Sequence, residues 1–263
     1  MTQPKNSFNL KSKRQLLLIG ITIVLFVGVF LMAPIPQDLS YHQFADTQMI
    51  FGIPNFWNVI SNLPFLLVGM IGLHALLNKQ ATGILTALNK IYITFFIGLI
   101  ITALGSSYYH WSPNNATLVW DRLPMTISFI AFFCIILGEN ISVKFATRLF
   151  PLLLLIGVSS VIYWKITESN GVGDLRPYVL VQFLPVIMIP LILWLYPSPF
   201  NGQRYIVLVL VAYVFAKLLE NFDHQVLEQL GFMGGHPIKH VAAAVGTYYL
   251  YLALKNRKLK RMR

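Results

Sequence analysis

The chain has 263 residues, of which 56% are hydrophobic and only 11% are charged, and its mean hydropathy is +0.66. These values exclude an ordinary water-soluble domain, whose surface needs many more polar and charged residues. They predict an integral membrane protein that crosses the bilayer several times, and the membrane lipid is therefore the first partner that the sequence identifies.

Eight apolar stretches are long enough to cross the hydrocarbon core of a bilayer as helices, which takes about 18 or more residues. The first could be mistaken for a signal peptide, but its apolar part is too long and no small-residue cleavage site follows at residues 33–36. It is therefore predicted to be a membrane span. The eight predicted spans are 16–33, 56–77, 91–110, 122–138, 148–164, 178–196, 204–222 and 237–254.

The formal net charge of +11 is explained by membrane topology and does not indicate a nucleic-acid partner. Most Lys and Arg residues precede the first span, lie in alternate connections or belong to the tail KNRKLKRMR. The positive-inside rule then places both termini in the cytoplasm. The third span should therefore end near the extracytoplasmic face, and the fourth and eighth spans should begin there.

Polar residues gather at this outer level. Ser106 and His110 close the third predicted span, Asp121 opens the fourth, and His236 and His240 open the eighth. A spacing of four residues on a helix brings the last two imidazoles to one face, and Ser106 shares a face with His110 in the same way. Three imidazoles and a water would make the open tetrahedral site of a catalytic zinc ion.

Each of these histidines taken alone would more often be an interfacial or hydrogen-bonded residue, but their convergence at one depth favours a functional site. Near the outer end of the seventh span, Lys217, Glu220 and Asp223 form either an ion pair or substrate contacts, and we favour the ion pair. Two further sets are expected to have structural roles. They are the polar face of Asn58, Ser61 and Asn62, and the remaining histidines His42, His74 and His224.

Three segments resemble the signatures of the alkaline ceramidases, within the superfamily that includes the adiponectin and progestin receptors. They are NFWNVISNLPF (55–65), SSYYH (106–110) with Asp121 eleven residues after its histidine, and HPIKH (236–240). The resemblance implies an all-α membrane protein with a seven-helix catalytic domain at 46–254, an added N-terminal helix within 1–45 and a basic cytoplasmic tail at 255–263. It also implies a catalytic zinc site at Ser106, His110, Asp121, His236 and His240.

The chemistry of such a site suits an amide. Zinc lowers the pKa of a water toward about 7 and polarises a carbonyl. Asp121 is suited to act as general base and acid, and Ser106 to donate to the oxyanion. We therefore expect an amidase that acts on ceramide or a related N-acyl lipid. The alternatives are a receptor with a structural zinc ion and a zinc hydrolase of lipid esters. The sequence does not identify a protein partner.

The resemblance also raises the question of calcium, which alkaline ceramidases bind through acidic and amide residues just before the FWN segment. Calcium takes six to eight oxygen ligands, usually including several carboxylates. Here residues 41–55 offer one carboxylate, Asp46, with Asn55 where the family has an acidic residue. Asp38 and backbone carbonyls are the remaining oxygen sources nearby. Calcium is therefore doubtful, and we expect activity without it.

Overall fold

The computed structural model of the chain describes residues 6–260. All regular secondary structure in these residues is helical, apart from two isolated β-bridges. Ten α-helices and two short 3-10 helices, Leu39–His42 and Thr86–Leu88, make up this part. The α-helices are α1 (Asn6–Leu31), α2 (Phe56–Ile60), α3 (Leu63–Leu77), α4 (Asn89–Trp111), α5 (Leu118–Asn140), α6 (Val143–Ser169), α7 (Arg176–Leu195), α8 (Arg204–Asn221), α9 (Asp223–Leu230) and α10 (Gly235–Asn256).

The helices confirm the prediction of an all-α, multi-pass membrane protein. Within the described residues, α1, the pair α2 and α3, and α4 to α7 give six spans that are long and apolar enough to cross a membrane. A seventh is obtained if α8 and α9, which meet at a bend of 80°, are taken as one span. Each coincides with a predicted apolar stretch, although several helices extend beyond the predicted ends.

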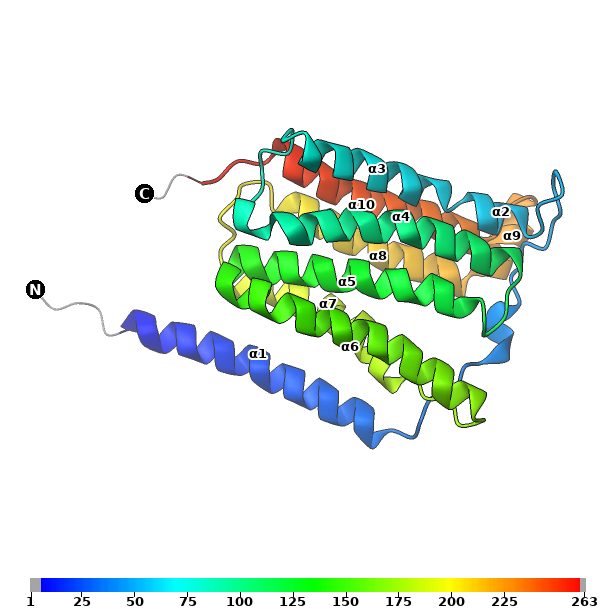
Figure 1. Ribbon diagram of the computed structural model, residues 1–263, viewed down its shortest axis with the longest axis horizontal. Helices are drawn as coiled ribbons and strands as arrows, with labels where there is room; N and C mark the ends of the chain where they lie inside the picture. The colour runs from blue at the N-terminus through cyan, green and yellow to red at the C-terminus, as the bar shows by residue number, and fades with distance from the viewer. Residues whose placement is uncertain (1–5, 261–263) are drawn as a thin grey trace, which may run out of the picture.

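The predicted eighth span, 237–254, forms a full helix but is less apolar than the others. It lies within α10, which has 22 residues and runs alongside α3 (Figure 1). Its composition is diluted by His236, Lys239 and His240 in its first two turns. These residues face the interior of the protein, where α10 packs against α8 and α3. Polar residues of a membrane helix are tolerated where they face the interior of the bundle, whereas the exposed side of α10 carries Val241, Val245 and Tyr248.

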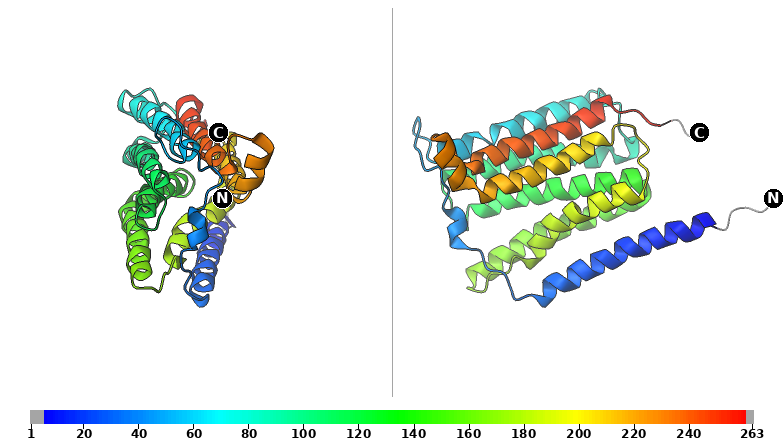
Figure 2. Two further views of the ribbon diagram at one scale, coloured as in Figure 1. Left: turned by 90° about the vertical axis from the view of Figure 1, so that its right-hand side faces the viewer. Right: turned by 180° about the vertical axis from the view of Figure 1, so that it is seen from behind.

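The helices form one bundle in which α4 packs against α3 and α5, and α5 packs against α6 and α7 (Figures 1 and 2). Helix α1 lies on the outside and packs against α7. The start of α1 and the end of α10 lie at one end of the bundle, here called the inner end, whereas α2, α9 and the start of α10 lie at the other, the outer end. Which end faces the cytoplasm remains a prediction.

Two glycines bring helices close together at the outer end. A Cβ on Gly105 of α4 would lie 2.0 Å from the carbonyl oxygen of Trp120 in α5, and a Cβ on Gly235 would lie 2.2 Å from that of Leu219 in α8. Any larger residue would push these helices apart, because real Cβ atoms do not approach an oxygen so closely. The close approaches fix the end of α4 against the start of α5, and the start of α10 against α8.

The inner end is closed by a buried ion pair. The guanidinium of Arg257 donates to Oε2 of Glu139 at 2.9 Å and also bonds its other carboxylate oxygen, while its Nε donates to the Gly83 carbonyl at 2.7 Å. Tyr92 donates to the same carboxylate, and the Phe200 ring lies 4.0 Å from the guanidinium carbon. Arg257 belongs to the predicted basic tail, but here it is a buried part of the bundle.

Candidate metal-dependent active site

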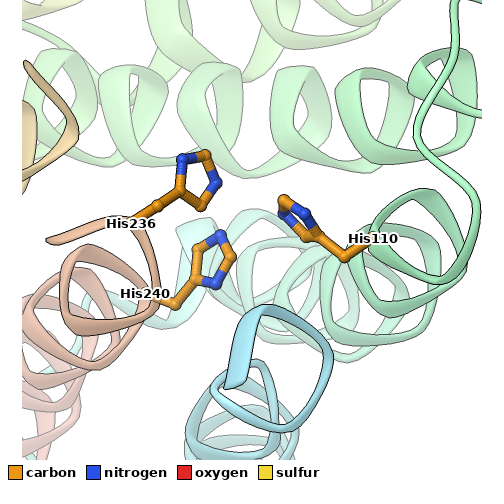
Figure 3. Close-up of side chains that lie close together, drawn as sticks. All are labelled: His110, His236 and His240. Carbon is orange, nitrogen blue, oxygen red and sulfur yellow. The ribbon is translucent and has the colours of Figure 1, made fainter. Parts of the chain in front are cut away.

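Three histidines from two distant parts of the chain meet at the outer end of the bundle. His110 comes from the last turn of α4, and His236 and His240 come from the first two turns of α10. Figure 3 shows the three rings facing a common point. Their centroids lie 4.9 Å apart in each pair, and one nitrogen of each lies within 4.8 Å of the other two. All three side chains are buried. The predicted ligands are thus brought together.

The nitrogen atoms of this cluster suit a metal ion. Nδ1 of His110 and Nε2 of His236 are buried without a hydrogen-bond partner among the described residues. Buried polar atoms almost always have a hydrogen-bond partner or bind an ion, so these two nitrogen atoms are available to bind a metal ion. No thiolate or carboxylate belongs to the cluster. Three imidazoles are ligands for a borderline ion such as zinc and leave one tetrahedral position for the reaction.

The third histidine is oriented by a serine. The hydroxyl of Ser61 donates to the Asn58 carbonyl at 3.2 Å, and its oxygen lies 2.8 Å from Nδ1 of His240. With its proton directed at Asn58, the Ser61 oxygen is placed to accept from Nδ1–H of His240, and in that tautomer Nε2 is free to bind a metal ion. Ser61 lies in the break between α2 and α3, where Pro64 has no N–H to bond the Ile60 carbonyl. Ser61 was predicted to have only a structural role, and its contact with His240 was not predicted.

Two further residues support the cluster. The carboxylate of Asp223 accepts from the backbone N–H of His236 at 2.8 Å and from that of Ala45 at 2.9 Å, which fixes the beginning of α10. The ring of Phe44 lies 4.7 Å from the His110 ring and 4.4 Å from the His236 ring, between centroids. Phe44 thus covers one side of the histidines with an apolar surface. Neither residue carries a pattern in the sequence that would have identified it.

Asp121 and Ser106 lie together beside the histidines. Both side chains are buried, the serine hydroxyl lies next to the aspartate carboxylate, and both line the same cavity as His240. Their proximity follows from the close approach of α4 and α5 at Gly105. A carboxylate and a hydroxyl at one wall of the cavity can handle a proton and stabilise a developing negative charge, respectively.

The cavity has a volume of about 320 Å³ and is polar at one end and apolar at the other. Ser106 and His240 belong to the polar end, whereas Phe95, Phe132 and Ile189 line the part nearer the middle of the bundle. Along α4, the eleven residues from Phe95 to Ser106 span about 16 Å. The cavity therefore has the shape and character needed to hold an aliphatic chain with its polar group at the histidines.

The polar residues near the end of α8 divide into two separate contacts. Glu220 bonds Lys217 and also Lys239, at 2.8 Å, and accepts from the Tyr41 hydroxyl at 3.2 Å. Burial raises the pKa of Tyr41 well above its usual range, and the Glu220 carboxylate adds to this. Tyr41 therefore stays a donor. The ion pair that we favoured is present and lines the cavity, but Asp223 belongs to the contact with His236.

The segment considered for calcium uses its one carboxylate, that of Asp46, to cap the start of α2. Asp46 is buried and accepts from the backbone N–H groups of Trp57 at 2.9 Å, Gln48 at 3.2 Å and Asn58 at 3.4 Å. Asn55 donates its amide to the His110 carbonyl at 2.8 Å. The Asp46 carboxylate is thus hydrogen-bonded by backbone N–H groups of the protein itself. That activity does not depend on calcium stays a prediction.

Comparison with known proteins gives two matches. The sequence model of a family described as Ceramidase matches residues 45–261. The chain is also similar to Alkaline ceramidase 3 of Mus musculus, with 26% identity over 222 residues that cover 79% of this chain and 79% of the relative. The family match includes all five predicted site residues and begins after α1.

Proposed function

The chain belongs to the ceramidase family, and on that premise we propose that it hydrolyses the amide bond of ceramide or a related N-acyl lipid with zinc held by His110, His236 and His240. The products would be a long-chain base and a fatty acid. The observation that supports this most is the meeting of three buried imidazoles, of which His240 lines one cavity together with Asp121 and Ser106. A receptor with a structural zinc ion would not need that carboxylate and hydroxyl.

Asp121, Ser106 and Phe44 would each have a different role in the hydrolysis. When bound, zinc supplies a water of lowered pKa and polarises the amide carbonyl. Asp121 takes the proton of the attacking water and returns it to the nitrogen of the departing base. Ser106 donates its hydroxyl to the negative charge that develops on the carbonyl oxygen. Phe44 keeps bulk water away from the histidines, and the apolar part of the cavity holds an aliphatic chain of the substrate.

The proposal is tested by the metal dependence of hydrolysis. Purified protein in detergent should release the fatty acid from a short-chain fluorescent ceramide. A zinc chelator should abolish this activity and added zinc should restore it, because the neutral water of an unliganded site does not attack an amide. A calcium-selective chelator should leave the activity in place, because Asp46 is already engaged by backbone donors.

The two parts of this test can fail separately. Protein that is inert toward every N-acyl lipid supplied, with its zinc in place, would refute the amidase function. Activity that vanishes on calcium removal and returns on calcium addition would refute the interpretation of residues 41–55. Asp46 would then be the first calcium ligand to replace.

We further propose that the site lies near the extracytoplasmic face, as the charge distribution predicts. Asn114, between α4 and α5, and Asn256, at the end of α10, are exposed at opposite ends of the bundle. In intact cells an impermeant thiol reagent should label a cysteine placed at position 114 and fail to label one at position 256. The natural Cys134 is fully buried and provides a low background. The reverse pattern of labelling would invert the orientation.

A further inference from the structure

Arg122 is a buried cation in the wall of the cavity. It follows Asp121 in the first turns of α5, is only 6% exposed and lines the same cavity. Its Nη2 donates to the side-chain oxygen of Gln37 at 2.6 Å, which is a neutral partner. Its Nη1 is buried and has no hydrogen-bond partner among the described residues. Within residues 6–260, no carboxylate lies within 4 Å of this guanidinium.

Three aromatic rings hold the guanidinium in place. Its central carbon lies 4.4 Å from the ring centroid of Trp164 in α6, 4.9 Å from that of Tyr178 in α7, and 5.8 Å from that of Tyr41 in the outer connection. Such contacts act on the face of the planar cation. They orient the group but supply no acceptor for the N–H bonds of Nη1. The aromatic contacts therefore account for the position of Arg122 and not for its free donor.

The other two cations of the cavity wall in the described residues each contact a carboxylate. Lys217 and Lys239 share the Glu220 carboxylate, so each has an acidic partner. A buried charge without a counter-ion is costly, and inside a membrane protein it usually marks a functional site. Among the three cations that line the cavity in the described part of the chain, Arg122 is thus the one without a carboxylate partner, and the lining, whose acidic residues are Asp121 and Glu220, carries an excess of one positive charge.

We propose that Nη1 of Arg122 binds an anionic oxygen on the headgroup of the substrate, so that the protein prefers N-acyl lipids with an acidic headgroup to neutral ceramide. This inference rests on the proposed function, because it concerns the same cavity. The planar fork of an arginine suits the oxygens of a phosphate or a carboxylate. Arg122 lies beside Asp121, so an amide held at the histidines would place its headgroup near this guanidinium.

The test compares two lipids that differ only by the phosphate on the headgroup, a short-chain ceramide and its 1-phosphate. The wild-type protein should show the higher kcat/KM for the phosphate. Arg122→Gln should lower the ratio of the two kcat/KM values by about tenfold to a hundredfold, as expected for loss of a hydrogen bond to a charged group. Arg122→Lys, which keeps the charge, should retain part of the preference. Arg148→Gln, at an exposed position of α6 near the inner end, is the matched control and should leave the ratio unchanged.

A binding measurement separates this inference from the proposed function. Urea analogues of the two lipids lack the scissile amide, and their binding can be measured by native mass spectrometry even if the protein hydrolyses neither lipid. Stronger binding of the phosphate analogue, lost in Arg122→Gln, supports the inference. Equal binding of both analogues, or equal loss of both in Arg122→Gln, overturns it. A third result would also overturn it. If Arg122→Gln is inhibited less by free fatty acid than the wild type but keeps the same ratio of the two kcat/KM values, Arg122 binds the carboxylate of the product.

Discussion

Asp121→Asn is expected to keep the bound metal and to lower the rate of ceramide hydrolysis by about 10²–10⁴-fold, the usual contribution of general acid–base catalysis. The amide has nearly the same shape as the carboxylate but cannot accept the proton of the attacking water. Asp121 does not belong to the histidine cluster, so the metal ligands remain complete. The measurement is the turnover of a short-chain fluorescent ceramide together with the zinc content of the same preparation.

The control for this variant is Asp38→Asn, which removes an exposed carboxylate from the connection between α1 and α2 and should leave the turnover unchanged. If Asp121→Asn hydrolyses ceramide at the wild-type rate, Asp121 is not the base. That result would leave the metal ligands and the family unaffected. If the variant also loses its zinc, Asp121 contributes to metal binding and the assignment of roles must be revised.

The double variant His236→Ala, His240→Ala is expected to lose both the metal and the activity. Wild-type protein should carry about one zinc ion per chain, because three imidazoles suffice for an open catalytic site. One remaining imidazole, that of His110, cannot hold the ion. Metal analysis by mass spectrometry gives the stoichiometry, and circular dichroism gives the helix content. The helices should persist in part, because they satisfy their own backbone hydrogen bonds in lipid.

His224→Ala is the matched control for the double variant, since His224 is an exposed histidine of α9. It should retain the zinc and the activity of the wild type. Full zinc stoichiometry in the double variant would show that the ion is bound elsewhere and would refute the site.

The sequence predicted the spans and the metal ligands for physical reasons that do not depend on tertiary structure. Long apolar runs have few alternatives to membrane helices, and the spacing of His236 and His240 places both on one face of α10. Once the spans are known, their alternation brings His110 to the same end as these two. Helix α10 was still predicted because His236, Lys239 and His240 lie in its first two turns and a long, mostly apolar stretch follows them.

The roles of the supporting residues could not be predicted from the sequence, because they depend on contacts between distant segments. Ser61 reaches His240 across 179 positions, and Asp223, at the bend between α8 and α9, bonds the backbone of His236, a contact that no spacing rule predicts. Phe44 looks like any other aromatic residue in a connection. The isolation of Arg122 from carboxylates becomes visible only when the partners of Lys217 and Lys239 are known.

The buried pair of Glu139 and Arg257 sets an order for the assembly of the protein during synthesis. The two residues are 118 positions apart, so α5 enters the membrane long before its counter-charge has been translated. The same holds for His110, which meets His236 and His240 only when α10 arrives. Until then Glu139 has Tyr92 of α4 as a partner but no counter-charge, and His110 lies without the other two imidazoles at the opposite end. Insertion of α10 therefore completes the ion pair at one end of the bundle and the histidine cluster at the other.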